Sequence, residues 1–183
     1  MKVKSILKTA SSTFGLLPGI CIMLTNIGLP PGLSNVLFGG IVEAAGALTL
    51  LLLALRKKNI QALSGKRIMR LSLVFFICFL TTFLGYIFLY SSSIVHNSFW
   101  DQTIFFPFWN TPDLKEAIKR YGSRNDAITN YGPDAIREMI LESPVFLTLT
   151  KLLLASLYLA IFESLTLSFG FAAIKLEKEK SLF

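Results

Sequence analysis

The stretch GGIVEAAGALTLLLLALRKK, residues 39–58, decides the class of this chain. It is a long apolar run that ends in three cationic residues, and about 20 apolar residues cross a bilayer as a helix. One ionisable side chain, Glu43, interrupts the run. A charge at that depth is costly in lipid, so we expect Glu43 to face other helices.

The composition extends this interpretation to the whole chain. Of its 183 residues, 53% are hydrophobic and 16% are charged, and the mean hydropathy is +0.61. An average soluble domain has about 25% charged residues. Four apolar blocks are long enough to span a membrane: 6–29, 33–55, 68–90 and 145–174. We predict an all-α fold, an integral membrane four-helix bundle forming a single transmembrane domain. The alternative is a soluble helical protein with an unusually apolar core.

The first block is the least regular of the four. Pro18, Gly19 and Asn26 interrupt it, so neighbouring helices must cover its backbone. The lysines near its start also fit a signal peptide, but no A-x-A-like cleavage site follows. Pro30-Pro31-Gly32 fits a tight turn between two spans. We therefore interpret the block as a retained span.

Cationic residues gather at one set of span ends. Twelve of the 18 lysines and arginines lie before the first span, in the loop 56–70 or after the fourth span. Four crossings place these segments on one side, and the positive-inside rule makes that side cytoplasmic. We expect cytoplasmic termini, an exported segment 92–143 and no nucleic-acid partner. The lack of an N-x-S/T sequon fits a bacterial inner membrane, while a eukaryotic internal membrane stays open.

The exported segment begins with an aromatic stretch, SFWDQTIFFPFWN. Tryptophan and phenylalanine beside a span end suit the lipid headgroup layer. The residues predicted to lie there are Trp100, Phe105, Phe106 and Trp109. The alternative function for this stretch is a pocket for an aromatic ligand or a quinone.

The rest of the segment has the pattern of short soluble helices. Asn110 or Thr111 can cap a helix whose first residue is Pro112. Farther along, YGSRNDAI (121–128) and YGPDAI (131–136) look like a small repeat, with a second helix start at Gly132-Pro133-Asp134. The repeat predicts two short helices, each entered by a Tyr-Gly turn. Together they would form a small extramembrane cap.

Residues able to carry catalysis are few. The single histidine, His96, and two separated cysteines within spans do not make a metal site. No nucleophile, zinc-protease, Walker or dinucleotide motif is present. We expect no catalytic residues, no metal, no cofactor and no enzymatic activity.

Two acids within the spans, Glu43 and Glu163, are therefore the candidate site. Glu43 lies thirteen residues before Arg56 and Glu163 twelve before Lys175, so both sit roughly 18–20 Å above the cytoplasmic boundary. Each lies on a stripe of small residues typical of close helix contacts. The predicted packing residues are Gly39, Gly40, Gly46, Ala47, Ala160 and Gly170.

Level depth and matching stripes predict that Glu43 and Glu163 are mutual neighbours inside the bundle. Three roles fit this position. The carboxyls can pin helices together, line an ion or proton path, or hold the polar head of a hydrophobic ligand such as a quinone.

The stretch LPPGLSNVLFGGIVEAAGALTLLLLALRKK, residues 29–58, resembles the DoxX-like family of small four-span membrane proteins. Its Leu29-Pro30 turn, Glu43, the small residues 44–47 and the basic end at Arg56 carry the resemblance. The family implies a compact four-helix bundle associated with redox or quinone-linked membrane complexes, usually as an accessory subunit. It carries over Glu43 as a family position.

These observations favour a non-enzymatic accessory or assembly subunit of a membrane complex. Its partners would be the lipid bilayer and another protein or a second copy of itself. One alternative is an oligomeric ion channel or membrane-perturbing effector lined by the intramembrane carboxylates. The other is a quinone-linked oxidoreductase subunit.

Overall fold

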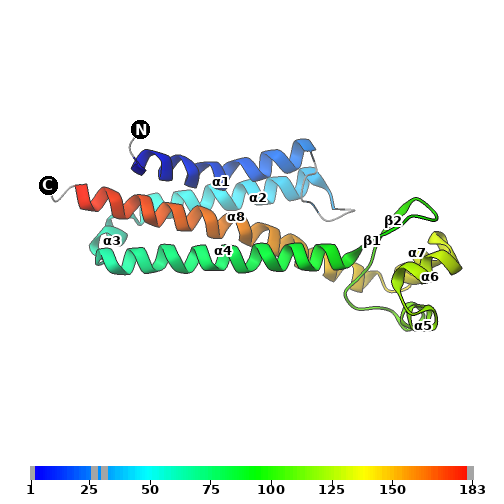
Figure 1. The fold of residues 1–183 in the computed structure, drawn as a ribbon. Coiled ribbons are helices and arrows are strands. Elements are labelled where there is room, and N and C mark those ends of the chain that lie inside the picture. The colour runs from blue at the N-terminus through cyan, green and yellow to red at the C-terminus, as the bar shows by residue number, and fades with distance from the viewer. Residues whose placement is uncertain (1–2, 26–28, 30–32, 181–183) are drawn as a thin grey trace. The chain divides into compact units, whose positions relative to one another are not determined.

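Four long helices dominate the computed structural model, which describes residues 3–25, 29 and 33–180. They are α1 (Val3–Thr25), α2 (Asn35–Leu55), α4 (Gly65–Ser93) and α8 (Pro144–Lys180) (Figure 1). Each is long enough and apolar enough to cross a membrane, which agrees with the four predicted blocks. Helices α4 and α8 extend beyond the predicted 68–90 and 145–174 at both ends. The predicted turn at residues 30–32 lies outside the described residues.

The ends of the second span follow local rules. Ser34 precedes α2, and its hydroxyl accepts a hydrogen bond from the backbone N–H of Leu37. Helix α2 ends at the cationic residues, where a short helix, α3 (Lys57–Ala62), follows. Ser64 then accepts from the N–H of Arg67 at the beginning of α4. Side-chain oxygens thus satisfy backbone donors that a helix start leaves free.

The chain divides into two compact units, residues 1–84 with 157–183 and residues 85–156. Helices α4 and α8 contribute residues to both units. In the first unit, α1 and α2 approach through glycines. A Cβ atom on Gly39 would lie 2.7 Å from the carbonyl oxygen of Gly19, and one on Gly46 would overlap the backbone of Gly15. This spacing leaves no room for side chains, as in small-residue contacts between membrane helices.

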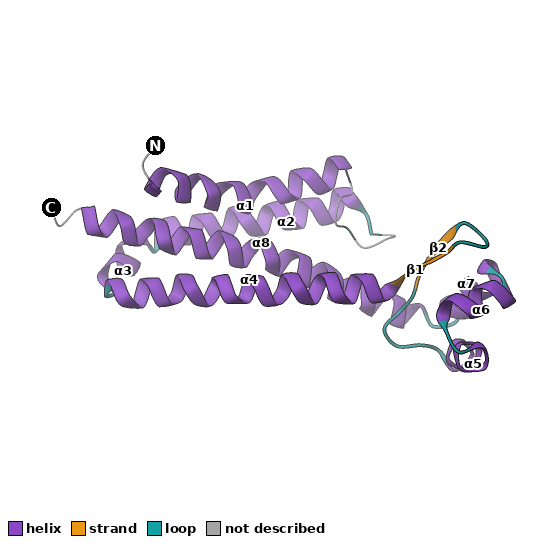
Figure 2. Cartoon of the chain, viewed as in Figure 1, coloured by secondary structure: helices purple, strands orange, loops and turns teal. Residues whose placement is uncertain are grey.

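The chain is mainly helical, as the all-α prediction requires, but the second unit also contains two short strands that the prediction did not include. Strands β1 (Ile94–Asn97) and β2 (Gln102–Phe105) form an antiparallel hairpin that pairs Ile94 with Phe105 (Figure 2). β-branched residues in both strands suit a half-buried sheet. This hairpin was not predicted because the many aromatic residues of the stretch 98–110 also suit a membrane interface.

Three short helices follow the hairpin: α5 (Pro112–Tyr121), α6 (Arg124–Tyr131) and α7 (Pro133–Leu141). Helix α5 begins at the predicted Pro112, where the Thr111 hydroxyl accepts from the N–H of Leu114 at 3.3 Å. Helices α6 and α7 each follow a Tyr-Gly turn, as the repeat predicts. Gly122 and Gly132 have φ of 86° and 84°, a backbone region that favours glycine.

A small apolar core holds the second unit together. Its fully or almost fully buried residues come from β2, the segment after it and all three short helices. They are Ile104, Phe106, Leu114, Ala127, Ile128, Ile136 and Ile140. The unit therefore has the buried core that short amphipathic helices need.

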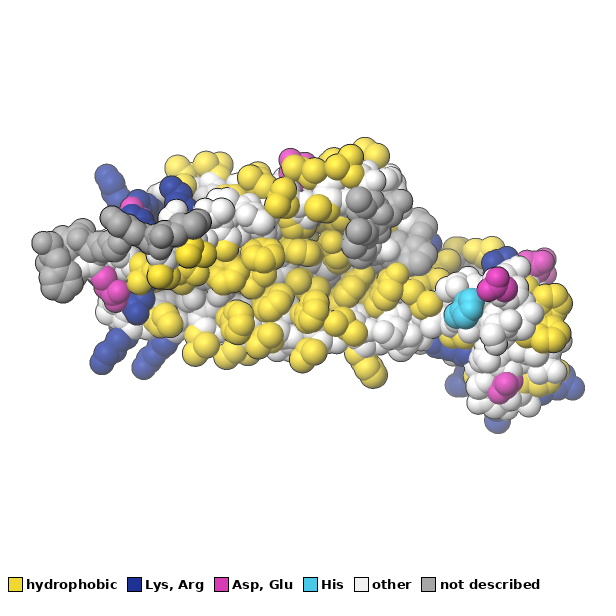
Figure 3. Space-filling model, turned by 45° about the horizontal axis from the view of Figure 1, so that its top comes forward, with side chains coloured by type: hydrophobic (Ala, Val, Ile, Leu, Met, Phe, Trp, Pro, Cys, Tyr) yellow, Lys and Arg dark blue, Asp and Glu magenta, His cyan; other side chains and the backbone are white. Residues whose placement is uncertain are grey.

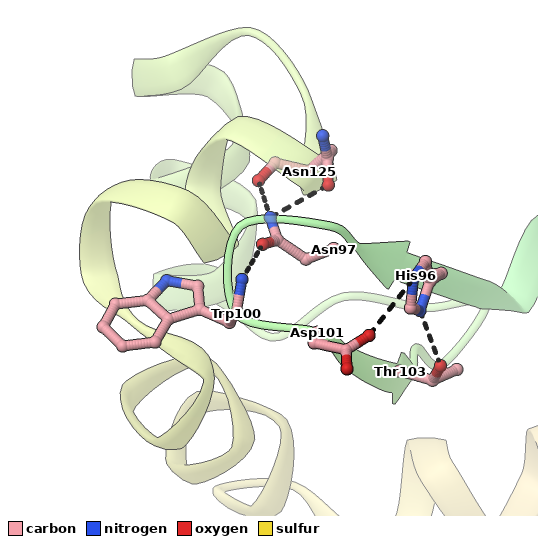
Figure 4. A network of polar contacts seen from close by, with 6 residues as sticks. All are labelled: His96, Asn97, Trp100, Asp101, Thr103 and Asn125. Carbon is pink, nitrogen blue, oxygen red and sulfur yellow. Dashed lines mark hydrogen bonds and ion pairs between the residues drawn. The ribbon is translucent and has the colours of Figure 1, made fainter.

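The hairpin turn is attached to α6 by one buried side chain, Asn97, which is 1% exposed. Its amide nitrogen donates to the backbone and side-chain oxygens of Asn125 at 3.1 and 3.0 Å and to the Thr129 hydroxyl at 2.8 Å. Its oxygen accepts from the N–H of Trp100 at 3.0 Å (Figure 4). Across the hairpin, His96 contacts Thr103 and Asp101. The turn is thus part of the folded unit.

Arg124 links the same elements from the start of α6. Its guanidinium lies 4.9 Å from the centre of the Phe106 ring and donates to the carbonyl of Ser92 at 2.6 Å. Burial lowers the pKa of Arg124 from its ordinary value. The cation is stabilised there by an aromatic face and by carbonyl oxygens.

Candidate functional site

The Glu163 carboxyl of α8 has a partner on α2. The Thr49 hydroxyl donates a hydrogen bond to Oε2 of Glu163, and both side chains are half-buried. This contact joins two of the long helices through a polar pair within their apolar length. It satisfies a carboxyl that would otherwise be exposed to hydrocarbon.

Glu43 faces a different helix. A Cβ atom on Gly19 would lie 2.5 Å from the Cβ of Glu43, so the base of this side chain packs against α1. Within the described chain, neither carboxyl hydrogen-bonds to the other, and the partner of Glu163 is Thr49. The predicted shared carboxylate pair is therefore not seen. The prediction compared depth and small-residue stripes, and neither fixes which side of α2 faces α8. Thr49, the partner of Glu163, lies about 120° around α2 from Glu43.

The residues predicted to pack helices closely together do not all lie in close helix contacts. Gly39 and Gly46 lie in the close contact with α1, and a Cβ atom on Gly170 would lie 2.5 Å from Leu53. Ala160 is half-buried. By contrast, a Cβ atom on Gly40 would meet only Met23 at an ordinary 3.6 Å, and Ala47 is exposed. Gly40 is thus in ordinary contact with α1 through Met23. The prediction of close packing is wrong for Ala47, which is exposed.

Two further polar contacts on α8 were missed by sequence reasoning. The Ser11 hydroxyl of α1 donates to the carbonyl of Thr166 at 2.8 Å. Ser72 of α4 and Ser168 of α8 each donate to the other's carbonyl, at 2.9 and 3.0 Å. Serine and threonine in spans are common, and they usually bond to their own helix, so composition alone does not identify these contacts.

The stretch ESLTLS, residues 163–168, is thus a place where α8 makes polar contacts with all three other long helices. Within six residues it makes polar contacts with α2 through Glu163, with α1 through Thr166 and with α4 through Ser168. The Thr166 hydroxyl is fully buried and has no hydrogen-bond partner among the described residues. The alternation of polar and apolar residues in ESLTLS was the available sequence signal.

The aromatic residues at 99–109 differ in how far they are exposed. Trp100 and Trp109 are 44% and 51% exposed, and Phe105 is half-buried. Phe106 is fully buried in the core of the second unit, so its predicted place in the headgroup layer is wrong. The hairpin turns Phe106 inward beneath Arg124, whereas Phe99 and Trp100 form an edge-to-face pair at the exposed tip.

In the described part of the chain, no three histidine, cysteine, aspartate or glutamate side chains are grouped so that they could hold a metal ion. Comparisons with protein families, curated proteins and solved structures found no match to this chain. The DoxX-like resemblance of residues 29–58 therefore stays a prediction. The fold defines a helical protein with four helices able to cross a membrane.

Proposed function

We propose that this protein is an integral membrane four-helix bundle that acts as a non-enzymatic accessory or assembly subunit of a membrane complex. The observation that carries the proposal is the stretch 163–168, where α8 contacts α1, α2 and α4 in turn. The polar groups of this stretch form hydrogen bonds between helices. An accessory subunit needs such a fixed scaffold, whereas a pore needs polar groups that face an open path.

The outer surface of the long helices supports the same proposal. Yellow apolar side chains are the most frequent kind along the visible face of this unit, where a magenta acidic side chain also lies, and blue cationic side chains gather at one end (Figure 3). Of the most apolar part of α4, only 11% is buried within the chain, against 28% for α1 and for α8. Such a surface suits lipid tails and the helices of a partner protein.

We place both termini and the loop 56–70 on the cytoplasmic side, in a bacterial inner membrane, with the segment 92–143 exported as a cap. Three segments distant in sequence bring cations together at one end of the first unit. Lys4 and Lys57 both form ion pairs with Glu177, at 3.2 and 2.9 Å, and Lys178 donates to the carbonyl of Leu63. A basic cluster built from three segments fits the positive-inside rule.

The test separates a scaffold from a channel. The full chain is reconstituted into liposomes, and cation flux is compared with that of empty vesicles; we expect no difference. In native membranes solubilised with a mild detergent, the protein should migrate in a complex with a stoichiometric second protein. A robust flux that Glu43→Gln abolishes, or a pure homo-oligomer, would overturn the proposal in favour of the channel.

A further inference from the structure

A pocket opens between α1, α2 and α8 at the basic end of the first unit, with a volume of about 370 Å³. Each helix contributes one stripe at helical spacing. The stripes run from Lys4 to Ser12 on α1, from Leu50 on α2 to Lys57 at the start of α3, and from Gly170 to Glu177 on α8. Three faces therefore converge on one cavity of the size that holds small ligands.

The mouth of this pocket is cationic. Three ammonium groups line it, those of Lys4, Lys8 and Lys57, against the single carboxylate of Glu177, which leaves a net charge of +2. Glu177 binds Lys4 and Lys57 through the same oxygen, Oε1, and so holds both ammonium groups at the pocket. Lys8 makes no ion pair with a described residue. An ammonium has three donors, so all three lysines keep N–H groups for an anion.

The wall of the pocket below the lysines is apolar. Its apolar lining consists of Leu50, Leu53 and Ala54 of α2 and Ala173 and Ile174 of α8, and Ser11 and Ser12 of α1 also line the pocket. A soluble anion would leave this wall in contact with water. A molecule with a phosphate at one end and hydrocarbon at the other would match both parts.

We propose that this pocket binds an anionic phospholipid, with its phosphate among Lys4, Lys8 and Lys57 and part of an acyl chain against the wall of α2 and α8. Basic pockets between transmembrane helices on the cytoplasmic side have the chemistry that binds anionic headgroups. Glu177 acts as a positioning residue because it orders two of the lysines. This site is independent of the proposed accessory role and depends only on the first unit lying in a membrane.

The experiment compares two lysines at the same end of the unit. The full chain in non-ionic detergent is titrated with phosphatidylglycerol or with phosphatidylcholine of the same acyl chains, and bound lipid is measured by native mass spectrometry. Lys8 lines the pocket, whereas the exposed Lys58 does not. We expect Lys8→Gln to weaken phosphatidylglycerol binding about fivefold. Lys58→Gln should leave it unchanged, and neither should alter phosphatidylcholine binding.

Two further measurements distinguish a bound phospholipid from free phosphate. Ala54→Phe places a ring against the apolar wall and should weaken phosphatidylglycerol binding without removing a charge. Inorganic phosphate should not displace the lipid. Equal losses in Lys8→Gln and Lys58→Gln, no preference over phosphatidylcholine, or displacement by phosphate would each overturn the proposal. Circular dichroism confirms that every variant keeps its helices.

Discussion

The two units of this chain are stabilised in different ways. In residues 1–84 with 157–183, helices meet through glycines, through single hydroxyl contacts and through a small buried cluster of Leu53, Ile60, Ile68 and Ile174. Many of the large apolar side chains of this unit lie on its outside. In residues 85–156, seven apolar side chains are buried together in one core. The second arrangement is the usual result of the hydrophobic effect in water. The arrangement in residues 1–84 with 157–183 is expected in a membrane. Lipid tails are as apolar as leucine, so the hydrophobic effect does not drive the helices together.

This difference between the two units predicts which substitutions should lower the stability of each. A unit with a buried core loses stability when a core side chain is shortened. A unit held by close backbone contact loses stability when a small residue is enlarged. The predictions below test this contrast in order of decreasing effect.

Phe106→Ala should have the largest effect and should act on the second unit. The ring is fully buried and covers Arg124, so its loss leaves a cavity and a less stabilised cation. We expect the free energy of local unfolding, measured by amide hydrogen exchange in α6, to fall by about 3–5 kcal/mol. Phe99→Ala is the control, since that ring is 72% exposed. Similar losses in both variants would contradict a buried core in this unit.

Gly46→Ala should act on the first unit, by enlargement. The new methyl group would overlap the backbone of Gly15, so α1 and α2 must separate. We expect a loss of about 1–3 kcal/mol in the free energy of unfolding in detergent. Gly85→Ala is the matched control, because nothing lies within 4 Å of its added Cβ. Alanine there should stabilise the helix slightly, by up to about 1 kcal/mol. A neutral Gly46→Ala would rule out close contact of the two helices.

Thr49→Val tests the polar contact between α2 and α8. The substitution keeps the shape and removes the hydrogen bond to Glu163. Membrane hydrogen bonds average about 0.6 kcal/mol, with a maximum near 1.7, so we expect a loss in that range. Thr81→Val is the control, because its hydroxyl bonds to the carbonyl of Ile77 in its own helix.

A double change sharpens this test. Combining Thr49→Val with Glu163→Leu removes both partners and should cost less than the sum of the two single changes. Additive losses would show that the two side chains do not interact. The same measurement on Glu43→Leu with Glu163→Leu should give additive losses, since the two acids have different neighbours.

The smallest effect should be a pH dependence of the second unit. Loss of solvation, with repulsion from the Asp113 carboxylate, raises the pKa of Glu142. A carboxyl with a raised pKa in the folded state favours folding when it is protonated. Its destabilising effect is therefore absent below the unfolded-state pKa and complete above the folded-state pKa. Stability should rise slightly as the pH falls through that window, as measured by thermal unfolding.

Glu142→Gln should remove this contribution, and Asp113→Asn should reduce it. An unchanged pH profile in Glu142→Gln would assign the dependence to other groups. The first unit offers a contrast, because changes confined to residues 113 and 142 should leave its melting temperature unaltered.

Local features of the chain were predictable from the sequence. Hydropathy over about 20 residues identified the four long helices, because any segment in hydrocarbon must be apolar and must satisfy its own backbone. The start of α5 at Pro112 and the two Tyr-Gly turns were predictable for a similar reason. A cap and a positive φ depend on a few neighbouring residues and on nothing distant.

Contacts between elements were decided only by the tertiary structure. Sequence placed Glu43 and Glu163 at one depth, but packing against Gly19 turned Glu43 toward α1 and left Thr49 as the partner of Glu163. The burial of Phe106 depended on a hairpin that pairs residues 94–97 with 102–105. The basic pocket depended on Lys4, Lys57 and Glu177, which are far apart in the chain. The rotation of a helix about its axis is set by the helices around it, and no local pattern specifies those neighbours.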